Sequence, residues 1–183
     1  MDIKSERKNR IKELTNDIGV YALCDLDQIP LYVGQSMDGI RSRVSRHLTS
    51  ARSDVIANRQ LDIWEVFEVW AWPLAGSSKA EVSHVENHLI HLFNDQNPLV
   101  NGKLPERSAQ IPNIPEKQIA TIMSNDERAL RLIPSQRLPR QLGHLKDLFS
   151  HILEVKDNIE QRRMLKVHFD RSHKYYKNFM GED

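Results

Sequence analysis

Two short apolar runs near the N-terminus limit the fold more than any other feature of the sequence. The first run covers residues 18–24, the second covers residues 29–34, and the polar stretch 25–28 separates them. Apolar runs of this length on either side of a short polar connection predict a β-hairpin. Neither these runs nor any other approaches the roughly 18–20 apolar residues of a membrane span, so we expect no membrane contact.

The pattern downstream of the hairpin alternates between helix and strand. Apolar residues recur at helical spacing over residues 40–53, where Ile40, Val44, Leu48 and Ala51 share one face. Residues 62–72 are rich in aromatic and β-branched side chains, which is typical of a strand. A capping-box pattern opens a second helix over residues 78–94. This order predicts an α+β domain with a small three-stranded antiparallel sheet flanked by helices.

The character of the chain changes after residue 103. Three prolines mark a linker-like stretch, and the spacing of apolar residues then predicts helices over 116–133 and 140–169. We therefore expect an N-terminal arm or helix (1–15), a catalytic or binding domain (16–103) and a helical C-terminal extension (104–183).

Composition places limits on the compartment and on the binding partner. The 183-residue chain has one cysteine, Cys24, which can form neither an internal disulfide nor a cysteine-based zinc site, so we expect a reducing intracellular compartment, the cytoplasm. The net charge of +1 argues against binding nucleic acid through overall basicity. The N-terminal half is mildly acidic and the C-terminal half is basic, so charge is unevenly placed.

Tyrosine, arginine and histidine side chains gather around the predicted hairpin. Tyr21 and Tyr32 lie on its two arms, where cross-strand neighbours are about 5 Å apart and two phenols can meet, although tyrosine is also a common strand residue. Arg43 and His47 are four residues apart on the first helix and share a face. A guanidinium suits a phosphate and an imidazole exchanges protons near neutral pH. The alternative is a solvated basic helix face.

Glu86 is the most unusual residue of the second helix. It falls among apolar residues that define the buried stripe, where a carboxylate is costly unless it is paired or bound to a cation. A structural ion pair with an arginine and a magnesium ligand are both open interpretations. Asn101, which follows Pro98, fits either a turn or the frame of a site.

Taken in order, these residues resemble a known superfamily. The segments 19–21 (Gly-Val-Tyr) and 32–34 (Tyr-Val-Gly) are similar to the paired motif of the GIY-YIG nucleases. The likeness continues through Arg43, His47, the run 86–90 (Glu-Asn-His-Leu-Ile), Pro98 and Asn101, and covers about residues 16–103. It implies a three-stranded antiparallel sheet flanked by helices and a metal-dependent DNA endonuclease with one Mg²⁺ or Mn²⁺ in each active site.

The resemblance also implies roles for individual residues. Glu86 would be the metal ligand, Arg43 the phosphate-contacting cation, and Tyr32 either the base or the group that positions the attacking water. Tyr21 would orient the nucleophile, and His47 would assist proton transfer. Further implied positions support the site (Gly34, Gln35, Arg41 and Asn101) or contact nucleic acid (Arg41 and Arg46).

The expected activity is therefore hydrolysis of phosphodiester bonds in duplex or branched DNA. The alternative is a catalytically weak or inactive nucleic-acid-binding module that keeps the fold, because many family members carry a cation where this chain has Gln35. A homodimer formed through the C-terminal helices is a further expectation, since it would place two sites on opposite strands.

Overall fold

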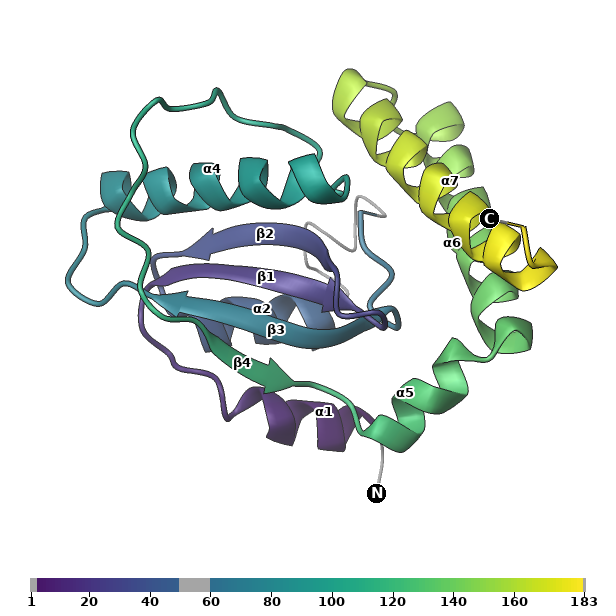
Figure 1. The fold of residues 1–183 in the computed structure, drawn as a ribbon, viewed down its shortest axis with the longest axis horizontal. Helices are drawn as coiled ribbons and strands as arrows, with labels where there is room; N and C mark the ends of the chain where they lie inside the picture. Colours follow the sequence, from purple (N-terminus) through teal and green to yellow (C-terminus); the bar gives the residue numbers. More distant parts are fainter. Residues whose placement is uncertain (1–2, 50–59, 183) are drawn as a thin grey trace.

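The fold is built around one antiparallel sheet. The computed structural model describes residues 3–49 and 60–182. Its four strands are β1 (Gly19–Asp25), β2 (Pro30–Ser36), β3 (Val66–Pro73) and β4 (Gln118–Thr121), in the order β2-β1-β3-β4 (Figure 1). The predicted α+β class and the hairpin formed by β1 and β2 are confirmed.

The prediction of three strands is wrong. Strand β4 lies where we expected a helix, and it pairs with β3 from Glu68 to Ala71. Gln118 anchors its start, because the side-chain amide accepts from the Thr15 N–H (2.8 Å) and donates to the Glu13 carbonyl (2.9 Å). These partners are distant in the sequence, and a strand of four residues is too short for its own alternation to be recognised.

The described helices are α1 (Ile3–Ile11), α2 (Ile40–Thr49), α4 (Lys79–Gln96), α5 (Asn125–Leu132), α6 (Pro134–Glu154) and α7 (Ile159–Met180), and the first three cover the two faces of the sheet. Helices α1 and α2 lie on one face and α4 lies on the other (Figure 1). Every residue of β1 is buried for this reason: Tyr21 and Leu23 face α2, while Val20 and Ala22 face α4. None of the described helices is long and apolar enough to cross a membrane.

The predicted start of α4 agrees with the structure, and the predicted end of α2 falls on residues that the structure does not describe. The capping box is confirmed, since Ser78 Oγ accepts from the Glu81 N–H and the Glu81 carboxylate accepts from the Ser78 N–H. Helix α2 is described to Thr49, and the predicted continuation over residues 50–53, with Ala51, lies outside the described residues.

The C-terminal extension contains a helical hairpin instead of the single helix expected over 140–169. The chain breaks between α6 and α7, where the Asn158 side chain accepts from the Gln161 N–H and caps α7. Val155 and Ile159 lie at this break and are 72% and 84% exposed, so the apolar spacing over residues 140–169 does not mark one continuous buried stripe.

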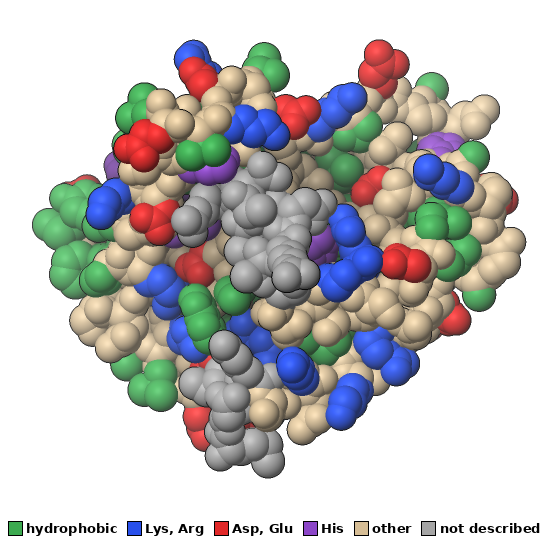
Figure 2. All heavy atoms as spheres, turned by 180° about the vertical axis from the view of Figure 1, so that it is seen from behind, with side chains coloured by type: hydrophobic (Ala, Val, Ile, Leu, Met, Phe, Trp, Pro, Cys, Tyr) green, Lys and Arg blue, Asp and Glu red, His purple; other side chains and the backbone are tan. Residues whose placement is uncertain are grey.

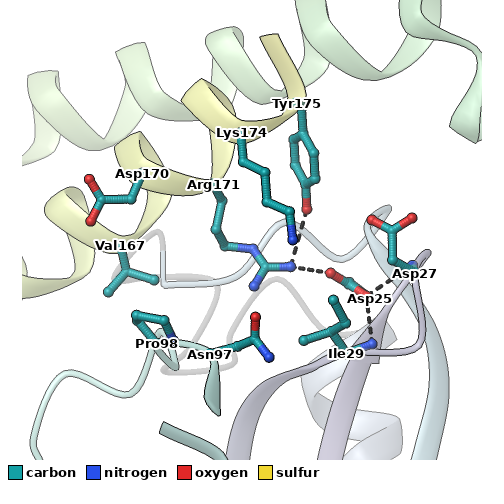
Figure 3. Close-up of a pocket in the computed structure, with 10 residues that line it drawn as sticks. All are labelled: Asp25, Asp27, Ile29, Asn97, Pro98, Val167, Asp170, Arg171, Lys174 and Tyr175. Carbon is teal, nitrogen blue, oxygen red and sulfur yellow. Dashed lines mark hydrogen bonds and ion pairs between the residues drawn. The ribbon is translucent and has the colours of Figure 1, made fainter. Parts of the chain in front are cut away.

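A largely buried network of charges fixes the C-terminal helices to the sheet. Arg171 points toward Asp25 at the end of β1, beside the Tyr175 hydroxyl (Figure 3). Burial raises the pKa of the Asp25 carboxyl, and Arg171 opposes that rise. Two arginines of α6 extend the network to acidic residues near the same end of the sheet, in the pairs Arg137–Glu65, Arg137–Asp27, Arg140–Asp62 and Arg140–Glu65. These contacts hold α6 and α7 against the end of the sheet where β1 stops and β3 begins.

Candidate functional site

The two tyrosines of the hairpin lie close together on the face of the sheet that α2 covers. The register pairs Tyr21 with Gly34 and Leu23 with Tyr32, so the tyrosines are diagonal neighbours, with ring centroids 6.3 Å apart. Gly34 makes this approach feasible. A Cβ at position 34 would lie 2.6 Å from Tyr21 Oη and 2.9 Å from a ring carbon of Tyr32. Glycine is therefore required sterically where the two phenol rings converge.

Helix α2 adds His47 and Arg43 to the tyrosine pair. His47 Nε2 lies 2.7 Å from Tyr21 Oη, and its ring centroid is 5.9 Å from that of each tyrosine. Burial and the neighbouring Tyr32 raise the pKa of Tyr21 well above its usual value, although a hydrogen bond with Arg43 lowers it. Tyr21 therefore keeps its proton, which suits a group that orients a neighbour through hydrogen bonds better than a base.

Glu86 approaches the tyrosine site from α4, across the outer edge of β2. Its carboxylate accepts hydrogen bonds from the Gln35 backbone and side chain, and burial nevertheless raises the pKa of Glu86 to about 7. The Gln35 side-chain amide in turn donates a hydrogen bond to Ser83 Oγ (3.2 Å). Glu86 is half-buried at the margin of the apolar stripe and not within it. A carboxylate at this position can hold a cation, which would lower its pKa again.

Asn101 closes the edge of β2 beside Glu86. Its Oδ1 accepts from the Val33 N–H (3.0 Å), and its Nδ2 donates to the Val33 carbonyl (2.8 Å). The Val100 N–H donates to the Leu31 carbonyl at 2.7 Å. These bonds satisfy backbone groups of an edge strand that would otherwise be open to another chain. Asn101 thus frames the site by fixing its wall.

Arg41 and Arg46 are held away from the tyrosines. Arg41 Nε donates to the Leu14 carbonyl after α1 (2.8 Å), and Arg46 forms an exposed ion pair with Asp38 (2.8 Å). Helical geometry places Arg41 and Arg43 on different sides of α2. Of the three arginines proposed from the sequence, Arg43 is the one that forms a hydrogen bond with Tyr21.

Tyr32, Glu86 and Asn101 line a common cleft of about 410 Å³. Its opposite wall comes from residues that the sequence did not point to: Lys103, Lys156, Glu160, Gln161 and Met164. Most of them lie at or beside the break between α6 and α7. The Asn158 cap was the local signal for that break, but no local signal places it beside β2.

The side chains of the cleft that could bind a metal ion limit the kind of ion that the cleft could hold. Within residues 3–49 and 60–182 there is no group of three or more His, Cys, Asp or Glu residues able to hold a metal. A single carboxylate fits a magnesium ion that keeps most of its waters and binds substrate phosphate.

Comparison of the chain with protein-family models, with curated proteins and with solved structures found no match.

Proposed function

We propose that the chain is a GIY-YIG-type endonuclease that hydrolyses phosphodiester bonds in DNA with one Mg²⁺ or Mn²⁺ in each active site. The observation that carries the proposal is the convergence of Tyr21, Tyr32, Arg43 and His47 next to a half-buried carboxylate, that of Glu86. Glu86 also influences the ionisation of Tyr21, although it comes from a helix on the opposite face of the sheet.

Each side chain has a chemical role consistent with its surroundings. Tyr32 lines the cleft and can position the attacking water or accept its proton. Arg43 can stabilise charge that develops on the phosphate. The buried hydrogen bond between Tyr21 and His47 fixes the rings behind Tyr32. When held by Glu86, a divalent cation supplies Lewis-acid polarisation of the phosphate and of a water.

One observation favours a non-catalytic nucleic-acid-binding module. Tyr21 and His47 are fully buried and bonded to each other, so both can be explained by stability of the fold. Figure 2 shows Lys and Arg side chains interspersed with acidic ones over one face of the molecule. Such a surface supports moderate, salt-sensitive contact with a phosphate backbone.

Cleavage of covalently closed plasmid DNA separates the two functions. Wild type, Tyr32→Phe, Arg43→Ala and the control Arg10→Ala are compared with Mg²⁺, with Mn²⁺ and with EDTA. We expect metal-dependent nicking that Arg43→Ala slows by about 10²–10³-fold. Tyr32→Phe should also slow it strongly, whereas Arg10→Ala, on the exterior of α1, should leave it unchanged.

Two results would count against the endonuclease. Nicking that persists in EDTA, or that is equal in all four proteins, contradicts the assigned site. Salt-sensitive DNA binding without cleavage of duplex, branched or single-stranded DNA favours the binding module.

A further inference from the structure

The C-terminal helices build a wall of the cleft that faces Tyr32 and Glu86. Arg163 of α7 donates to the carbonyls of Leu99 and Asn101, and its second amino group lies 2.7 Å from Asn94 Oδ1. Gly102 allows close contact, because a Cβ there would lie 3.2 Å from Glu160 Cβ. The first turn of α7 is therefore fixed against the loop that follows α4. Both segments line the cleft, so its walls are held in place by these contacts.

Gln161 lines this cleft and carries an unsatisfied acceptor in its side chain. The residue is 3% exposed, and its Oε1 has no hydrogen-bond partner among the described residues. Buried polar atoms in folded proteins are nearly always paired, so an exception that lines a cleft points to a ligand with an N–H or O–H donor. The Tyr32 ring lines the same cleft and offers an aromatic surface.

The charges of the cleft fit a ligand that carries both donors and phosphates. Lys103 and Lys156 are exposed cleft residues and suit phosphate oxygens. Glu86 and Glu160 balance them, so the cleft is not simply an anion site. A nucleotide combines phosphate with base amino groups, and the volume of about 410 Å³ is that of a small-molecule site.

Resting on the proposed function, we infer that this cleft binds one unpaired nucleotide next to the scissile phosphate. A base outside the helical stack offers its Watson–Crick edge to side chains and its face to an aromatic ring. Gln161 accepts from that edge, and Lys103 and Lys156 contact the flanking phosphates. The enzyme therefore prefers bulged, looped or branched DNA to continuous duplex.

Binding measured without metal tests the inference separately from cleavage. Fluorescence anisotropy in EDTA compares a continuous duplex with the same duplex carrying one extra unpaired nucleotide. We expect wild type to bind the bulged DNA at least about tenfold more tightly, and Gln161→Leu to lose that preference while keeping its affinity for duplex. Because Oε1 has no hydrogen-bond partner among the residues that the structure describes, Gln161→Leu should keep or raise the melting temperature.

The lysines are tested with a matched pair of variants. Lys103→Ala/Lys156→Ala should lower affinity for the bulged DNA and reduce the slope of log K against log salt by about 2, one for each lost phosphate contact. Lys8→Ala/Lys146→Ala removes the same charge from exposed positions outside the cleft and should change the slope less.

The outcomes distinguish the two proposals. Equal binding of duplex and bulged DNA by wild type, or an unchanged preference in Gln161→Leu, overturns the nucleotide cleft even if plasmid is nicked. The expected preference without metal-dependent cleavage of any substrate upholds the cleft and overturns the endonuclease.

Discussion

Replacing Glu86 by glutamine should stabilise the protein while it removes the proposed metal ligand. Burial raises the pKa of Glu86 from its usual value of 4.5 to about 7, so the folded state favours the protonated carboxyl. Each unit of pKa difference corresponds to about 1.4 kcal/mol, which places the cost of the ionised form near 3 kcal/mol. The amide keeps one of the two hydrogen bonds from Gln35 and loses the other, at about 1 kcal/mol.

The net gain should therefore be on the order of 1–2 kcal/mol at pH 8, since the group is only partly buried and screening by water reduces the cost. This gain depends on pH. Because the folded-state pKa lies above that of the unfolded chain, the wild type loses stability as pH rises from 4.5 to about 7. The variant does not have this loss, so the two proteins should be nearly equal at pH 4.5 and differ fully above pH 7.

Urea unfolding in EDTA at several pH values measures the difference directly. Glu116→Gln is the matched control, because Glu116 is exposed outside the helices and strands and the same substitution there should leave stability unchanged at every pH. Added Mg²⁺ should stabilise the wild type and not Glu86→Gln. A variant less stable than wild type at pH 8, or a gap independent of pH, would refute the view that Glu86 is a costly carboxylate kept for a cation.

Three further substitutions test the packing around the site, each through the urea midpoint. Gly34→Ala places a Cβ against the buried Tyr21 hydroxyl and should cost about 1–3 kcal/mol; an unchanged midpoint contradicts the steric requirement. Asn101→Ala removes both hydrogen bonds to the β2 edge and should cost about 2 kcal/mol; an unchanged midpoint would show that these bonds add nothing to stability. Glu65→Gln removes the negative charge that pairs with the buried Arg137 and the partly buried Arg140 and should cost about 3 kcal/mol, whereas a neutral result would mean that the network adds nothing to stability.

The parts of the fold that the sequence predicted are those with local signals. The hairpin of β1 and β2 follows from two apolar runs with a short connection, and the start of α4 follows from Ser78 and Glu81. Strand β4 and the break before α7 depend on partners far along the chain. The Gln118 side chain is bound by the backbone of residues 13–15, which no window of neighbouring residues can reveal.

The site could be predicted to a similar degree. Helix period places Arg43 and His47 on one face, and the structure brings them to Tyr21. The same period does not show that the Leu14 carbonyl holds Arg41, because that contact depends on where α1 packs. Nothing in the sequence marks Gln161, whose buried Oε1 lacks a hydrogen-bond partner within the described ranges 3–49 and 60–182.

Nicking of closed plasmid DNA by wild type and Glu86→Gln, at pH 8 with Mg²⁺ and with EDTA, measures whether Glu86 holds a catalytic metal ion. We expect nicked circles with wild type and Mg²⁺, none with EDTA, and at least about 100-fold slower nicking by a Glu86→Gln protein that is fully folded. Equal nicking by the two proteins would contradict this role of Glu86, because the metal-dependent chemistry would then lie elsewhere.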